Sequence, residues 1–169
     1  MKRQRAAYLV VLVVGLLMAS PLAANAATNQ LSGEAVYDAT ACPGPPAGYE
    51  DFTSYPGLVL TGSIEGCLYA KVDFIEDTKL TPSGVYLESG EEVIVGSLDG
   101  GPVGTFTTTY RFESKWDPDP SGVELHGRCQ HPIVKGSGTG GFEGARGRLD
   151  FKDIVEEGTF DYRGHISVS

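Results

Sequence analysis

Apolar and polar residues alternate along several stretches of the chain. The clearest stretch is Thr105–Trp116, in which large apolar residues stand between threonines and charged residues. Its apolar positions are Phe106, Tyr110, Phe112 and Trp116. A period of two is typical of a strand with one buried face, and three consecutive threonines favour a strand over a helix. Beyond the N-terminal segment we find no 3.6-residue apolar period over ten or more residues, so we expect an all-β protein.

Further strands are predicted between turns rich in glycine and proline. They cover Leu31–Asp38, Leu58–Glu76, Val85–Glu88, Val93–Leu98, Val123–Cys129, Gly147–Ile154 and Gly158–Val168. The segment from Leu58 is too long for one flat strand, so we expect Gly62 or Gly66 to bend or divide it. The segments from Val85 and Val93 are either two strands or one bent strand. In Val123–Cys129 we expect Glu124 on the polar face.

The turns and the number of strands together predict the architecture. Asp99-Gly100-Gly101-Pro102 predicts a hairpin turn, and the segment 39–56, rich in proline and glycine, predicts a long loop. About eight antiparallel strands in one domain of residues 27–169 favour a closed barrel, because closure removes exposed sheet edges. We therefore expect an eight-stranded antiparallel β-barrel of calycin-like shape, whose lumen holds side chains or one small ligand.

The segment Gly136–Phe151 is rich in glycine and cannot be a helix interior, because each glycine there costs roughly 1 kcal/mol relative to alanine. It predicts a tight loop that leads into a strand, with Phe142 as an apolar plug beneath the loop. Its G-S-G-T-G-G sequence fits a dinucleotide-binding pattern, but the helix which that motif requires cannot follow here. Loop geometry is the better interpretation.

The same segment resembles the glycine-rich region of allene oxide cyclases and dirigent proteins, and is more similar still to secreted bacterial proteins of the allene oxide cyclase barrel-like family. Three further motifs support the resemblance: Phe106–Tyr110, Gly127–Pro132 and Phe151–His165. The resemblance implies an eight-stranded antiparallel barrel. It also implies, as one alternative, an isomerase that moulds a reactive substrate in an apolar cavity, or a dirigent-like protein that steers radical coupling. No catalytic residue of those families aligns here.

Residues 1–26 have the pattern of a secretory signal peptide. Lys2, Arg3 and Arg5 precede the apolar run Tyr8–Ala19, and Ala24-Asn25-Ala26 fits the cleavage site. The apolar run is shorter than the about 20 residues of a membrane span. We therefore expect cleavage after Ala26, secretion and no membrane span.

Charge limits the partners. The chain has a formal net charge of −9, and loss of the three basic residues of the signal peptide makes it −12. Such a surface repels phosphate backbones, so nucleic acids and anionic membranes are disfavoured as partners.

Three cysteines would enter an oxidising compartment, which predicts one disulfide and one odd thiol. We favour Cys67–Cys129, because both lie in predicted strands whereas Cys42 lies in the long loop. The alternation places Cys67 and Cys129 on opposite faces, so this pairing requires a bulge at Gly66 or Gly127 to shift the register.

Catalytic and metal-binding signatures are weak. His126, Cys129 and His131 are close in sequence, but strand alternation separates His126 from the other two, so no metal and no cofactor are expected. No G-x-S-x-G motif occurs. The acid pairs Glu91-Glu92 and Glu156-Glu157 are expected to be solvated turn charges.

Aromatic residues are the remaining candidates for function. Those favoured for the wall of a ligand site are Phe106, Tyr110, Phe112, Phe160 and Tyr162. We expect a non-catalytic secreted barrel that binds a small apolar or amphipathic molecule at its mouth. The alternatives are the isomerase or dirigent-like activity, which an inward-facing carboxylate beside a cavity would favour, and a structural or interaction protein of the cell envelope, which a filled lumen would favour.

Overall fold

The computed structural model describes residues 28–118 and 122–169, and in this part of the chain every regular element is a β-strand. The strands are β1 (Thr28–Tyr37), β2 (Leu58–Gly62), β3 (Ile64–Thr78), β4 (Val85–Leu98), β5 (Val103–Trp116), β6 (Glu124–Pro132), β7 (Thr139–Gly140), β8 (Arg146–Ile154) and β9 (Thr159–Ser167). The predicted signal peptide lies outside the described residues.

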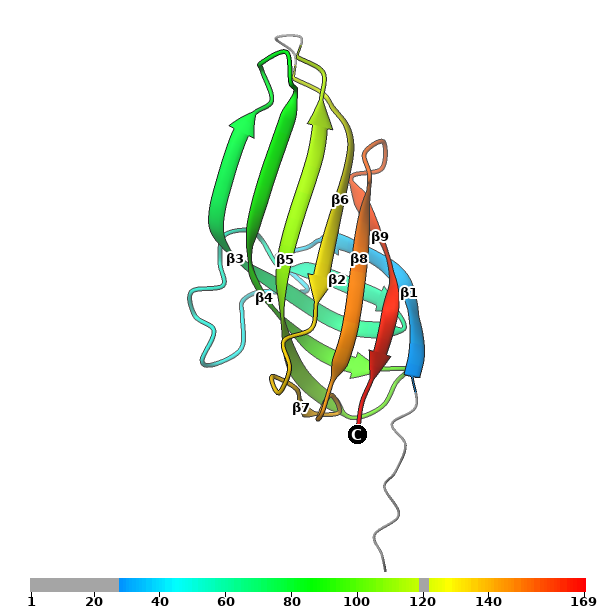
Figure 1. The fold of residues 1–169 in the computed structure, drawn as a ribbon. Coiled ribbons are helices and arrows are strands. Elements are labelled where there is room, and N and C mark those ends of the chain that lie inside the picture. The colour runs from blue at the N-terminus through cyan, green and yellow to red at the C-terminus, as the bar shows by residue number, and fades with distance from the viewer. Residues whose placement is uncertain (1–27, 119–121) are drawn as a thin grey trace, which may run out of the picture.

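Eight of these strands close into an antiparallel barrel (Figure 1). Each neighbouring pair is antiparallel in the ring order β1-β2-β3-β4-β5-β6-β8-β9, and β9 pairs with β1 to close it. The short β7 pairs only with the start of β5 and lies outside the ring. The predicted eight-stranded antiparallel barrel is confirmed.

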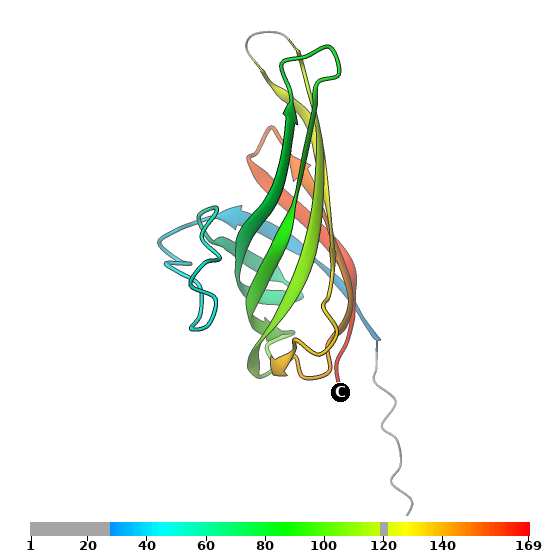
Figure 2. The same cartoon turned by 60° about the vertical axis from the view of Figure 1, so that its left-hand side comes forward.

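The long hairpins extend the barrel on one side. Figure 2 shows β3, β4, β5 and the start of β6 rising beyond β8 and β9. The segment from Leu58 is divided at Gly62, as predicted, where a φ of +98° and the close approach of Ser32 exclude a larger residue. The segment from Val85 is one continuous strand. Asp99 and Gly100 both have positive φ, so the predicted hairpin turn between β4 and β5 is confirmed.

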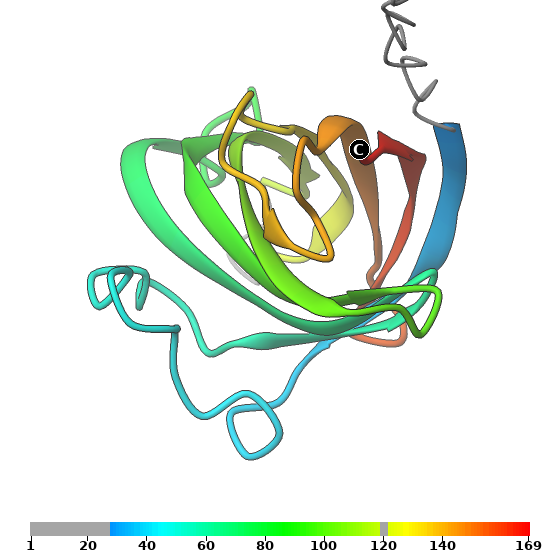
Figure 3. The same cartoon turned by 90° about the horizontal axis from the view of Figure 1, so that it is seen from below.

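The glycine-rich segment closes the lower end of the barrel in Figure 1, and in Figure 3 it lies across the opening of the ring. Phe142 is fully buried beneath it, and its ring centroid lies 4.8 Å from that of Phe106. A Cβ atom at Gly138 would lie 1.8 Å from the carbonyl oxygen of Phe142, so only glycine allows this approach. The predicted plug is confirmed.

The long loop between β1 and β2 packs against the outside of the barrel (Figure 3). Cys42 and Phe52 of this loop form a second apolar cluster with Tyr69 of β3 and Val93 of β4. A salt bridge of 3.2 Å between Asp51 and Lys71 lies beside it. The loop therefore covers the outer face of β3 and β4, while the main core fills the inside.

The predicted Cys67–Cys129 disulfide is wrong, because the disulfide joins Cys42 to Cys67 and leaves Cys129 as a buried free thiol. Cys67 faces outward, toward the long loop, whereas Cys129 faces the lumen between Phe112 and Phe151 on its two neighbouring strands. No bulge at Gly66 or Gly127 brings the two cysteines to one face. A disulfide indicates an extracellular or otherwise oxidising environment.

A bulge near the start of β6 also reverses a predicted orientation. Between Lys115 and Trp116 the register with β5 shifts, so that Leu125 has no partner in the ladder. Leu125 is 54 % exposed, and Glu124 faces the lumen instead. The expectation that Glu124 lies on the polar face is therefore wrong, and the bulge adds a carboxyl group to the interior.

Candidate functional site

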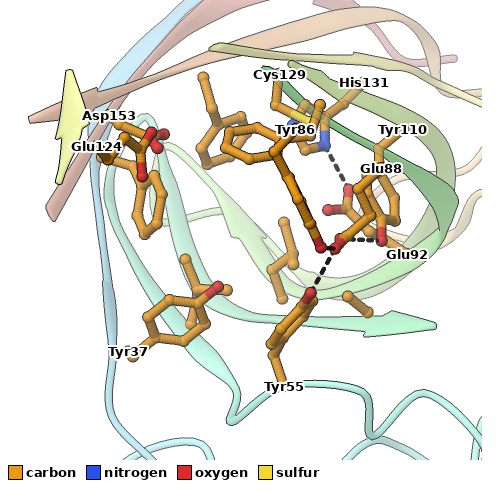
Figure 4. A pocket seen from close by; sticks show the side chains of 16 residues that line it. Tyr37, Tyr55, Tyr86, Glu88, Glu92, Tyr110, Glu124, Cys129, His131 and Asp153 are labelled. Atoms are coloured by element: carbon orange, nitrogen blue, oxygen red, sulfur yellow. Dashed lines mark hydrogen bonds and ion pairs between the residues drawn. The ribbon is translucent and has the colours of Figure 1, made fainter. Parts of the chain in front are cut away.

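The barrel contains a cavity of about 280 Å³ in the half away from the glycine-rich segment (Figure 4). Its lining combines an apolar wall with carboxyl groups, tyrosines and one histidine. The lining residues are Tyr37, Tyr55, Leu58, Leu68, Ala70, Tyr86, Glu88, Glu92, Tyr110, Phe112, Glu124, Cys129, His131, Phe151, Asp153 and Phe160. Ligand sites of small molecules typically have this composition, an apolar surface with a few convergent polar groups.

Strand β4 places two glutamates inside the barrel. Glu88 and Glu92 are separated by four residues, so the period of two aims both at the lumen, and each is only 5 % exposed. Glu91 between them is exposed. The expectation that Glu91-Glu92 is a solvated pair is thus wrong for Glu92, whereas Glu156 and Glu157 do lie exposed in a turn.

Glu88 is the acceptor for three tyrosine hydroxyls. Tyr55 of the long loop and Tyr86 of β4 donate to its Oε2 at 2.5 and 2.6 Å, and Tyr110 of β5 donates to its Oε1 at 2.6 Å. Burial, followed by the hydrogen bond to Glu88, raises the pKa of Tyr86 to about 12 and raises the pKa of Tyr55 and Tyr110 above the ordinary value of 10. These hydroxyls remain protonated donors, and they satisfy the buried carboxylate.

Glu92 has different partners. Its Oε2 accepts the Thr108 hydroxyl at 2.8 Å and is hydrogen-bonded to Nδ1 of His131. Thr108 lies directly opposite Glu92 in the β4–β5 ladder and is fully buried. His131 comes from β6 and is 3 % exposed. Its other ring nitrogen, Nε2, is buried without a hydrogen-bond partner.

Two aromatic rings fix the plane of the His131 ring. Tyr110 stacks on it with centroids 6.1 Å apart and an interplanar angle of 22°. The ring of Phe151 on β8 is tilted relative to the His131 ring, and the two ring centroids lie 4.5 Å apart. Packing on both sides, together with the bond to Glu92, leaves the imidazole with a single orientation.

A second pair of carboxyl groups lies on another wall of the cavity (Figure 4). Glu124 of β6 and Asp153 of β8 are hydrogen-bonded to each other above Gly127, which leaves room for them. Burial, and then the hydrogen bond and charge of Asp153, raise the pKa of Glu124 to about 7, and burial raises the pKa of Asp153 as well. Two adjacent carboxyl groups cannot both ionise easily, so the pair keeps one proton up to about pH 7.

The other side of the mouth is aromatic. The Tyr37 ring packs edge-on against Phe160 at 5.6 Å, and burial raises the pKa of its hydroxyl. Figure 4 shows this hydroxyl directed into the cavity. Leu58, Leu68 and Ala70 complete the apolar wall. The cavity therefore offers one apolar side and several separate polar groups.

The five residues predicted for a ligand wall divide into two groups. Tyr110, Phe112 and Phe160 line the cavity. Phe106 and Tyr162 do not: Phe106 packs on Phe142 in the closed end, and Tyr162 is buried with its hydroxyl bonded to the backbone of Ile64. As an assignment of ligand contacts, the set stays a prediction.

The sequence interpretation missed the four acidic residues and His131. The alternation pattern could have located Glu88 and Glu92. Both lie an even number of residues from Ile94 on the same strand, so they face the same side of the sheet as this buried residue. For Glu124 the parity argument pointed the wrong way, since the bulge cannot be read from the pattern. His126, the third member of the considered metal cluster, is exposed on the opposite face from Cys129 and His131.

Two negative observations apply to residues 28–118 and 122–169, and a third applies to the chain. No group of three or more His, Cys, Asp or Glu side chains there is arranged to hold a metal ion. No helix there is long and apolar enough to cross a membrane. Comparison with protein-family models, with curated proteins and with solved structures finds no match for the chain.

Proposed function

We propose that this protein binds one small, uncharged and largely apolar molecule that carries a hydrogen-bond donor. The observation that carries the proposal is the cavity of about 280 Å³, with an apolar wall on one side and carboxyl groups and a histidine on the other. A cavity of this size suits a ligand of one or two rings. An unfilled lumen favours binding over a purely structural role.

Charge selects the ligand class. Glu88 and Glu92 are buried acceptors, and Glu124 with Asp153 adds a further negative charge at neutral pH. An anionic ligand would be repelled in a cavity of low dielectric constant. The Nε2 atom of His131 has no partner and favours a ligand that donates a hydrogen bond. Phenols and apolar alcohols combine these properties.

A matched set of ligands tests this proposal. We expect 2-naphthol to bind saturably in titration calorimetry, whereas 2-naphthoate, the same ring system with a carboxylate, binds at least about tenfold more weakly because of the buried negative charges. Phe112→Ala removes part of the apolar wall and should weaken binding, while the exposed change Val103→Ala should not. Absence of 2-naphthol binding, or equal affinity for both ligands, would overturn the proposal.

A second candidate is an isomerase of the kind that the resemblance to allene oxide cyclases implies. One observation favours it: carboxyl groups lie beside a cavity, and Glu124 and Asp153 share a proton there. Secretion is proposed with either function, on the basis of the predicted signal peptide and the Cys42–Cys67 disulfide. Turnover of candidate epoxides by the purified barrel is the direct test.

A further inference from the structure

In the imidazole of His131, Nδ1 has a hydrogen-bond partner and Nε2 has none. Glu92 Oε2 accepts the Thr108 hydroxyl and is also hydrogen-bonded to Nδ1 of His131. When Glu92 is a carboxylate, the proton of this second hydrogen bond lies on Nδ1. The neutral ring then carries its lone pair on Nε2.

The burial of this nitrogen is unusual for a histidine with a purely structural role. His131 is 3 % exposed and lines the cavity, yet Nε2 has no hydrogen-bond partner. Leaving a buried polar atom unpaired costs stability, so buried histidines generally use both nitrogens. A partner supplied by a bound molecule would satisfy Nε2.

The arrangement of His131 has the parts of a general base. A carboxylate orients the ring and stabilises the imidazolium that forms when Nε2 takes a proton. Tyr110 and Phe151 prevent the ring from turning. Glu124 and Asp153, on a different wall, hold a proton that they can donate. A base and an acid thus face the same cavity from different strands.

We propose that His131 is a catalytic base that removes a proton from a carbon atom next to a carbonyl group of a small apolar ketone or aldehyde, while the Glu124–Asp153 pair protonates the carbonyl oxygen. This inference rests on the proposed binding function, with the acidic C–H of the ketone or aldehyde in the place of the hydrogen-bond donor opposite Nε2. It extends that function from binding to proton transfer, and it assigns the substrate class as carbon acids activated by a carbonyl group.

The step balances without a further reactant. The C–H bond breaks, its proton goes to Nε2, and its electron pair forms the C=C bond of an enol as the C=O bond electrons move to oxygen. The oxygen takes the proton of the carboxyl pair. In reverse, the enol O–H returns its proton to the pair, and Nε2 returns its proton to carbon. If the proton returns to the same carbon, the net result is hydrogen exchange with solvent. If it returns to a different carbon that is conjugated with the enol, the net result is the shift of a double bond.

Hydrogen exchange measures this step without knowledge of the natural substrate. 2-Tetralone is uncharged, has the ring system of 2-naphthol and carries exchangeable protons beside its carbonyl group. We expect the protein to accelerate their exchange in heavy water, followed by proton NMR, with saturation kinetics and inhibition by 2-naphthol. His131→Gln should lower the accelerated rate by about 100-fold. His126→Gln, on the outer face of the same strand, is the matched control and should keep it.

The outcomes separate the two proposals. Binding of 2-naphthol and 2-tetralone without acceleration, or equal acceleration by the His131→Gln variant, overturns the catalytic inference and leaves the binding function intact. Absence of binding overturns both. If His131→Gln does not fold, Glu92→Gln provides the test, because it keeps the side-chain volume and should lower exchange while 2-naphthol still binds.

The tautomer provides a readout that needs no variant. In protein labelled with nitrogen-15 at histidine, we expect His131 to be protonated at Nδ1 and unprotonated at Nε2 at pH 8. A hydrogen on Nε2 at that pH, in either the neutral or the charged form, would leave no base and would overturn the inference.

Discussion

The hydroxyl of Tyr162 on β9 accepts the backbone N–H of Ile64 at 2.9 Å and donates to the carbonyl oxygen of Thr61 at 2.9 Å. Tyr162 is 1 % exposed, so its buried hydroxyl takes the place of water as the partner of the two backbone groups at the break between β2 and β3. One side chain thus joins the last strand of the barrel to the junction of two strands that are not its neighbours.

Replacement of this tyrosine should destabilise the barrel. Tyr162→Phe leaves a buried N–H without its acceptor, which costs about 1–3 kcal/mol. Urea unfolding followed by circular dichroism measures the loss. Tyr37→Phe removes a hydroxyl directed into the cavity and should change the free energy of unfolding by less than about 0.5 kcal/mol. Equal effects of the two substitutions would show that the Tyr162 contact contributes nothing of its own.

The disulfide should stabilise the barrel through the long loop. Cys42 and Cys67 close a loop across a sequence separation of 25 residues, and the chain-entropy model gives about 3.5 kcal/mol for a loop of this length. The variant Cys42→Ala/Cys67→Ala should therefore unfold at lower urea concentration by about that free energy, while 2-naphthol binding weakens because Tyr55 at the end of the loop lines the cavity.

The remaining cysteine supplies the control for that prediction. Burial raises the pKa of the Cys129 thiol, so the thiol stays protonated in the folded protein. A thiol reagent should therefore react slowly under native conditions, and rapidly with one thiol in denaturant without reductant. Mass spectrometry of peptides should place the free thiol at Cys129. A free thiol at Cys42 or Cys67 would contradict the observed pairing.

Much of the fold could be predicted because local patterns determine it. Alternation located the strands, and the glycines at the β2–β3 break and in the β4–β5 turn are required by backbone geometry that other residues do not adopt. The cysteine pairing was predicted incorrectly although the pattern contained the right information: alternation placed Cys67 and Cys129 on opposite faces. The bulge invoked to reconcile them does not exist at either glycine.

The site was harder to predict because its acidic residues break the rule that charges face solvent. Glu88 is stable inside only because three tyrosines from different segments donate to it, and those contacts depend on the closed barrel. Glu124 faces inward because of a bulge at Leu125, one extra residue that a period of two does not reveal. Tertiary contacts, not local sequence, determine these two positions.

The Glu124–Asp153 pair makes a prediction for pH dependence. The folded protein raises the pKa of Glu124 from 4.5 to about 7, so between these values it binds more protons than the unfolded chain. Stability contributed by this group is present at low pH and is lost as the pH rises through that window. Glu124→Gln should reduce the loss, and above pH 7 the variant should be the more stable protein by an amount on the order of 1 kcal/mol, since partial solvent access screens the pair.

Urea unfolding between pH 4 and pH 8 measures that window. Glu156→Gln, in an exposed turn, is the matched control and should follow the wild-type curve. If the Glu124→Gln curve also runs parallel to the wild-type curve across the window, the two carboxyl groups do not share a proton.

The same pair should depend on the glycine beneath it. A Cβ atom at Gly127 would lie 2.4 Å from Oδ2 of Asp153 and 2.5 Å from Oε1 of Glu124, and 2.8 Å from the Phe112 ring. Gly127→Ala must therefore displace both carboxyl groups, which should cost about 1–3 kcal/mol of stability and lower the exchange of 2-tetralone protons. Gly44→Ala, where a Cβ atom has no neighbour within 4 Å, provides the control and should leave both quantities unchanged. A Gly127→Ala protein as stable and as active as Gly44→Ala would mean that the carboxyl groups tolerate displacement, and that their close approach over Gly127 is not what holds the proton.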